Sequence, residues 1–125
     1  MSNAPSVLFG LVPLVRATVR SATTGNLTTT VTADDSGTMF INLTTGTNAY
    51  TLPAVAAGNG KSWLFYKAET TTTMSVASTA ANMMGIDSAT GTTITSDAVL
   101  GSCLLIIGDG TNYFALVIAG TWTMA

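Results

Sequence analysis

The stretch LLIIGDGTNYFALVI, residues 104–118, decides the fold class of this chain. It consists of two apolar, β-favouring runs, 104–107 and 113–118, which flank the glycine-containing turn 108–112. Two such runs joined by a short turn of this kind are typical of a β-hairpin. We therefore expect an antiparallel strand pair here, with Trp122 beyond it closing the bottom of a core.

The chain before this hairpin alternates in the same way between short β-favouring runs and turn residues. Strands are expected over 28–32, 38–44, 49–52, 62–68, 73–77, 83–86 and 92–95. In 62–68, alternation of the side chains puts Trp63, Phe65 and Lys67 on one face and Leu64 and Tyr66 on the other. Because both faces carry apolar bulk, we expect this strand to be covered on both sides.

Helices and repeats are not indicated. No stretch has the 3.6-residue apolar period of an amphipathic helix, and residues 54–57 are expected to form one helical turn at most. No internal repeat of fixed period is found. The expected fold class is all-β, a small antiparallel sandwich or jelly-roll-like domain over residues 25–125. An extended N-terminal arm or first strand precedes it over residues 1–24.

The composition argues against most enzyme classes. Four basic and six acidic residues give a net charge of −2, which is too weak and scattered for a nucleic-acid binder. The sequence has no histidine, the commonest general base and metal ligand. Its single cysteine excludes an intrachain disulfide framework. No nucleophile, base and orienting partner can be assembled, so we expect no catalytic residues, no metal site and no cofactor.

The surface is expected to form hydrogen bonds but to be nearly uncharged. Threonine supplies about a fifth of the chain, and only 8% of the residues are charged. Low net charge favours association over mutual repulsion. One interpretation is a monomer with a threonine-rich surface; the preferred one is an obligate oligomer or a component of a larger assembly.

The N-terminal segment contains an apolar run, residues 7–15, interrupted by Pro13. The run is shorter than the roughly 18 residues of a transmembrane helix, and no Lys or Arg precedes it as in a signal peptide. We therefore expect an uncleaved protein. An extended arm on a partner surface is one expectation, and a first strand packed on its own domain is the other. As an arm, the segment would contact its partner through apolar anchors and two arginines: Val7, Leu8, Phe9, Leu11, Val12, Arg16 and Arg20.

Several short motifs resemble chemical sites but fit structural roles better. The sequence GNGKS, residues 58–62, lacks the first glycine of a phosphate-binding loop and precedes a strand rather than a helix, so it indicates a tight turn. The loop after Asp109 lacks the charge density of a calcium loop. Cys103 lies in an apolar run and is expected to be a small buried hydrophobe.

Four aromatic residues offer an alternative to a purely structural role. Trp63, Tyr66, Tyr113 and Trp122 together would suit a sugar-stacking platform. Aromatic residues at strand spacing are, however, more often part of a core.

A family resemblance rests on several segments between residues 27 and 114. They are residues 27–40 with the turn Asp34-Asp35-Ser36-Gly37, residues 48–53 with the following Ala57-Gly58 turn, the aromatic strand 63–67, and residues 108–114. This pattern resembles small structural proteins of tailed bacteriophages, in particular head-decoration (cement) proteins and related tail-fibre domains. The resemblance implies a compact β-domain that trimerises on the threefold and quasi-threefold positions of the capsid lattice.

The expected function is therefore that of a structural virion protein, a decoration protein that binds the outer shell as a homotrimer and stabilises it. Its partners would be the major capsid protein and its own copies, with no nucleic acid and no membrane. It would be made in the host cytoplasm and reside on the outer capsid surface, with the N-terminal arm as the lattice contact. The alternative is a tail-fibre or receptor-binding domain that recognises a host glycan through an exposed aromatic groove.

Overall fold

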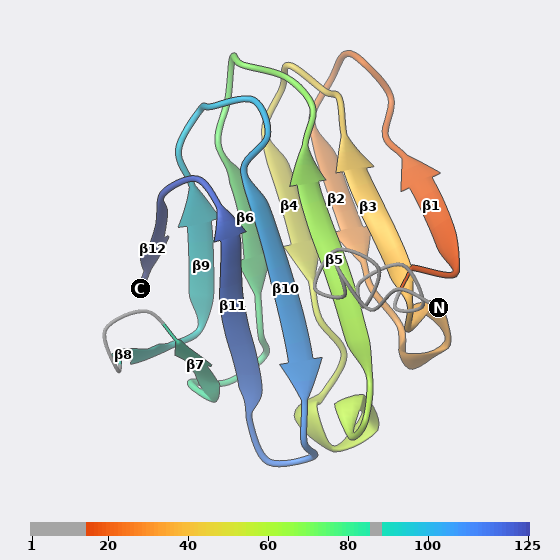
Figure 1. Ribbon diagram of the computed structural model, residues 1–125, viewed down its shortest axis with the longest axis vertical. Coiled ribbons are helices and arrows are strands. Elements are labelled where there is room, and N and C mark those ends of the chain that lie inside the picture. Colours follow the sequence, from red (N-terminus) through yellow and green to blue (C-terminus); the bar gives the residue numbers. More distant parts are fainter. Residues whose placement is uncertain (1–14, 86–88) are drawn as a thin grey trace, which may run out of the picture.

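The computed structural model describes residues 15–85 and 89–125. Over these ranges the chain forms two β-sheets that pack face to face, as Figure 1 shows. The larger sheet has the strand order β1-β3-β5-β10-β11-β7-β8, and the smaller sheet has the order β12-β9-β6-β4-β2. The strands are β1 (Ala17–Arg20), β2 (Leu27–Thr30), β3 (Thr38–Asn42), β4 (Asn48–Thr51), β5 (Ser62–Lys67), β6 (Met74–Ala77), β7 (Met83–Gly85), β8 (Ala89–Gly91), β9 (Thr93–Ser96), β10 (Cys103–Gly108), β11 (Tyr113–Ala119) and β12 (Trp122–Met124).

The predicted all-β sandwich is confirmed. Helical structure in the described residues is restricted to two short 3₁₀ helices, Ala33–Asp35 and Val55–Gly58. The second one corresponds to the single helical turn that the sequence allows near residues 54–57. In the described parts of the chain, no helix is long and apolar enough to cross a membrane.

The strand directions differ from the predicted antiparallel arrangement. β1, β3 and β5 are parallel neighbours in the larger sheet, and β2, β4 and β6 are parallel neighbours in the smaller one. The chain therefore changes sheet after each of these strands and winds through three turns of a flattened coil. Both sheets are mixed rather than antiparallel. The sequence missed this because side-chain alternation reports which face of a strand is buried, not the direction in which its neighbour runs.

The predicted C-terminal hairpin is confirmed. β10 and β11 pair antiparallel from Gly108↔Tyr113 to Cys103↔Ala119, with an irregularity in register at the Cys103 end. In the turn, the Asp109 carboxylate accepts hydrogen bonds from the backbone N–H groups of Thr111 (2.9 Å) and Asn112 (2.7 Å). β5 pairs with the other edge of β10, so the hairpin forms the centre of the larger sheet.

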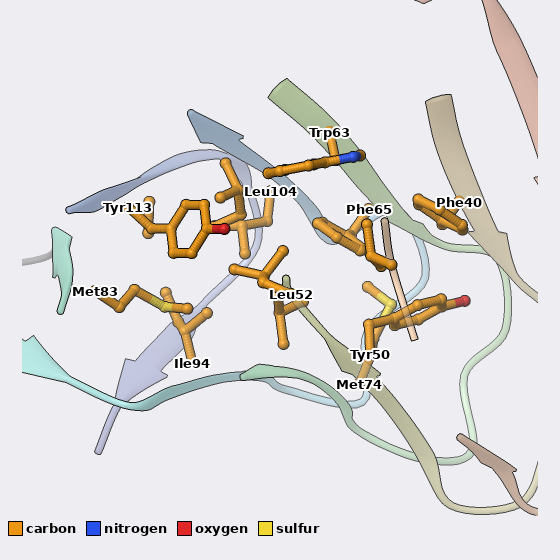
Figure 2. Packing of buried hydrophobic residues seen from close by; sticks show 14 of the residues in the cluster. Phe40, Tyr50, Leu52, Trp63, Phe65, Met74, Met83, Ile94, Leu104 and Tyr113 are labelled. Atoms are coloured by element: carbon orange, nitrogen blue, oxygen red, sulfur yellow. The ribbon is translucent and has the colours of Figure 1, made fainter. Parts of the chain in front are cut away.

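The core lies between the sheets and is rich in aromatic rings (Figure 2). Phe40 and Phe65 of the larger sheet stack with their ring centroids 5.5 Å apart. Tyr50 of the smaller sheet lies tilted against both rings, at 5.4 and 5.1 Å. Trp63 and Lys67 share the inner face of β5 with Phe65 and are also buried, as the alternation predicts.

The N-terminal boundary is described only in part. Residues 1–14 of the expected arm lie outside the described residues. Ala17–Arg20 forms β1, an edge strand that pairs with β3 and is exposed along its whole length. The described part of the segment 1–24 is thus a first strand of the sandwich.

Candidate interaction surface

An exposed apolar half-strand is the most distinctive surface feature of the described chain. Leu116, Val117 and Ile118, in the second half of β11, are 48%, 41% and 45% exposed. Leucine, valine and isoleucine are normally buried in β-strands. Three consecutive exposed residues cannot all belong to one face, since neighbouring side chains point to opposite sides. The half-strand therefore exposes apolar side chains on both faces.

The backbone edge of this half-strand is also open within the described structure. Among the described residues, β7 pairs with β11 only from Tyr113↔Met83 to Ala115↔Gly85, and Leu116, Val117 and Ala119 pair with β10 alone. A free, apolar strand edge is a template for strand pairing with another chain. The geometry at this position can therefore provide backbone hydrogen bonds and apolar contacts together.

Two further exposed apolar residues lie at the same end of the sandwich. Val99 and Leu100, in the loop between β9 and β10, are 54% and 55% exposed. In Figure 1 this loop and the turn between β11 and β12 lie at the same end of the molecule. We call Val99, Leu100, Leu116, Val117 and Ile118 the end patch.

The loop of the end patch is held by several hydrogen bonds. The backbone N–H of Asp97 donates to the carbonyl of Thr121 (2.9 Å), and the Ser102 hydroxyl lies 3.0 Å from both the Asp97 carboxylate and the Val99 carbonyl. Exposed apolar side chains on an anchored loop lose less conformational entropy on binding than those on a free one. The end patch is thus preorganised for contact with a protein surface.

Of the predicted contact residues, Arg16 and Arg20 are described and the others are not. Arg16 is exposed but bonded to the sandwich. Its guanidinium donates a hydrogen bond to the Ser36 carbonyl (3.0 Å), and its backbone N–H donates to the Gly37 carbonyl (2.7 Å). Arg20 is exposed on β1 and borders a groove of about 180 Å³ that Val19, Leu27, Phe40 and Tyr50 also line. The predicted apolar anchors Val7, Leu8, Phe9, Leu11 and Val12 lie outside the described residues.

Three of the four aromatic residues that offered a sugar-stacking platform as an alternative belong to the core instead. Trp63, Tyr113 and Trp122 are buried in the core, and only Tyr66 is partly exposed. The indole N–H of Trp63 donates to the Thr32 carbonyl (3.3 Å), and that of Trp122 to the Ala119 carbonyl (3.0 Å). The aromatic residues alternate with apolar neighbours on strands that face the second sheet, so their rings fill the core.

A buried ion pair, which the sequence did not indicate, lies at one end of the core. Lys67 is fully buried, and its ammonium donates to the carboxylate of Glu69 and to the Glu69 carbonyl (2.9 Å). Burial opposes ionisation of Glu69, but hydrogen bonds from Lys67, from the backbone N–H groups of Thr71 and Thr72, and from the Thr72 hydroxyl lower its pKa to about 2. Every polar group here is used in holding the loop after β5, which is a structural role.

The remaining reactive groups also have structural surroundings. Cys103 is a free, buried thiol, as predicted, and burial raises its pKa. The Asp109 carboxylate is used by its own turn; hydrogen bonds from Asn112 and Thr111 lower its pKa. Within residues 15–85 and 89–125, no three His, Cys, Asp or Glu side chains are grouped so that they could hold a metal ion. The exposed apolar surface described above is the candidate site.

Comparison with protein-family models, with curated proteins and with solved structures finds no match for this chain.

Proposed function

We propose that this protein is a structural virion protein, a capsid decoration protein that binds the outer shell as a homotrimer and stabilises it. The observation that carries the proposal is the end patch with its open strand edge. Several exposed apolar side chains at one end of a molecule suit a protein interaction site, and an open strand edge adds a means of pairing. The resemblance to phage decoration proteins supplies the identity of the partner.

The charge of the molecule supports an assembly role. The five end-patch residues are uncharged, and the whole chain has a net charge of −2. A surface of this kind does not repel its own copies strongly. A trimer would present three equivalent contact surfaces to the lattice, so modest individual contacts would combine into strong binding.

The glycan-binding alternative has less support. It requires exposed aromatic rings, and three of the four rings that suggested it are buried. We therefore propose the decoration function alone.

The test compares two glutamate substitutions in the purified protein. Leu116→Glu places a charge in the end patch, and Thr123→Glu places the same charge on an exposed position of β12. Each protein is analysed by light scattering for its oligomeric state and by co-sedimentation for binding to phage shells stripped of it. Circular dichroism verifies that both variants are folded.

We expect wild type and Thr123→Glu to form trimers and to bind the shells. Leu116→Glu should lose trimerisation or bind at least about tenfold more weakly, because burying one leucine contributes about 1.5–3 kcal/mol. If Leu116→Glu matches Thr123→Glu in both oligomeric state and shell binding, the end patch is not the contact surface. A wild-type protein that does not bind shells contradicts the decoration function itself.

A further inference from the structure

Two strand segments of the larger sheet are exposed at every position. One is β1, Ala17–Arg20, and the other is the second half of β11, residues 116–119. Among the described residues, β1 pairs only with β3, and the pairing of β7 along β11 ends at Ala115. The larger sheet therefore has an exposed strand segment of the same length on each of its two flanks (Figure 1).

The two exposed segments run in the same direction. β1, β3 and β5 are parallel neighbours, and β10 is antiparallel to both β5 and β11. β11 is therefore parallel to β1. Copies related by rotation about an axis along the strands thus present β11 of one copy to β1 of the next in parallel orientation. A twofold contact would instead join a segment to its own counterpart.

The strand register also places the two segments at the same level of the sheet. One row of register partners consists of Val19, Phe40, Phe65, Leu104 and Val117. The adjacent row consists of Thr18, Met39, Leu64, Leu105 and Leu116. A rotation with no shift along the strands therefore brings Val117 of one copy beside Val19 of the next. Head-to-tail contacts of this kind close into a ring, whereas a shift at each step gives an open helix.

The inner face of the sheet is complementary in shape at this level. Val117 shares its row with core residues and so lies on the inner face, yet it is 41% exposed. Val19 lies on the same face and borders the groove of about 180 Å³, whose most deeply buried lining residues are Phe40 and Tyr50. A space of this size accommodates an apolar group as large as a benzene ring. The groove beside Val19 therefore has room for the Val117 side chain of a neighbouring copy.

From the equal length, common direction and shared rows of the two segments, we infer that the second half of β11 in one copy lies edge to edge with β1 of the next. Val117 enters the groove beside Val19 of the neighbouring copy, and Leu116 lies beside Thr18 on the outer face. Three such contacts close the homotrimer; the number three rests on the proposed function, whereas the pairing of the segments does not. The loop residues of the end patch then remain for the shell.

Disulfide cross-linking tests this contact, because Val19 and Val117 cannot be joined within one copy. β1 and β11 are four strand spacings apart. This is roughly 19 Å, whereas the Cα atoms of a disulfide lie within about 7 Å of each other. In a Cys103→Ala background, the matched double variants are Val19→Cys/Val117→Cys and Thr18→Cys/Leu116→Cys. The control is the mismatched Thr18→Cys/Val117→Cys, whose cysteines lie on opposite faces. Circular dichroism verifies the fold of each protein before mild oxidation.

Both matched variants should form covalent dimers and trimers on a non-reducing gel, at least about tenfold more than the mismatched control, because only matched cysteines meet the geometry of a disulfide. No band above the trimer is expected, since a closed ring has no unpaired segment. Dimers formed by Val117→Cys alone would indicate a twofold contact between β11 segments and overturn the inference. Equal cross-linking of matched and mismatched variants, or a ladder extending above the trimer, would also overturn it.

Co-sedimentation of the same proteins with stripped phage shells separates this inference from the proposed function. Cross-linked trimers that do not bind shells would contradict the decoration function and leave the contact between β11 and β1 in place. A protein that binds shells but cross-links in neither matched variant would retain the decoration function and overturn this contact.

Discussion

The hydroxyl of Tyr113 donates a hydrogen bond of 2.7 Å to the backbone carbonyl of Pro53. This bond joins the start of β11 to the loop that follows β4, which lies on the other sheet. Tyr113 is fully buried, and burial raises the pKa of its hydroxyl, so the group donates as a neutral phenol. The ring also explains Gly58, because a Cβ there would lie 2.5 Å from the Tyr113 oxygen.

Replacing Tyr113 by phenylalanine should therefore destabilise the fold while leaving the ring packing in place. We expect Tyr113→Phe to lower the free energy of unfolding by about 1 kcal/mol, since the Pro53 carbonyl loses its donor. Urea denaturation measures this as a lower midpoint at an unchanged slope. Tyr66→Phe, at a partly exposed position, should change stability by less than about 0.5 kcal/mol. Equal losses in the two variants would mean that the Tyr113 hydrogen bond contributes nothing specific.

The Lys67–Glu69 pair predicts strong coupling between two substitutions. Glu69→Gln leaves the fully buried Lys67 ammonium without its counter-charge, so it should cost about 3 kcal/mol of stability. Adding Lys67→Met removes the buried charge and should recover a large part of that loss. A double-mutant cycle in urea measures the coupling. Additive effects of the two substitutions would contradict the buried pair.

The same pair predicts how stability responds to acid. The pKa of Glu69 in the folded protein is about 2, below its usual value of 4.5. Ionised Glu69 therefore stabilises the fold above about pH 4.5, and this contribution decreases as the pH falls toward 2. Thermal unfolding of wild type should show a loss of stability in this window that is smaller in Glu69→Gln. If Glu69→Gln lost more stability than wild type in this pH window, the lowered pKa of Glu69 would be contradicted.

Burial of both tryptophans predicts the fluorescence of the folded protein. Trp63 and Trp122 are 1% and 4% exposed, so their emission should be blue-shifted and poorly quenched by acrylamide. Titration with host-surface oligosaccharides should leave the emission unchanged, because neither ring is accessible for stacking. A saturable change in emission would support the glycan-binding alternative.

Strand positions could largely be read from the sequence because local alternation and turn residues determine them. The strand expected over 62–68 appears as Ser62–Lys67, with Trp63, Phe65 and Lys67 inward as predicted. The run expected to end at Pro53 forms β4, which ends at Thr51. The hairpin of β10 and β11 was predictable because both strands and their turn are contiguous.

The parallel winding could not be predicted in this way, because it depends on contacts between distant segments. Leu27 aligns with Asn48, and Asn48 with Met74. The sequence separation between Leu27 and Asn48 is shorter than that between Asn48 and Met74. The parallel winding therefore leaves no repeat of fixed period in the sequence. The end patch was missed for a related reason. The run 113–118 looks uniformly apolar, and nothing in it distinguishes the buried Tyr113 and Ala115 from the exposed Leu116, Val117 and Ile118.

The copy number of this protein in purified phage particles tests the decoration function most directly. Quantitative mass spectrometry against the major shell protein measures it. We expect a fixed ratio to the shell protein, with many copies on every particle, because a decoration protein follows the lattice. A few copies per particle, or none, would contradict the account.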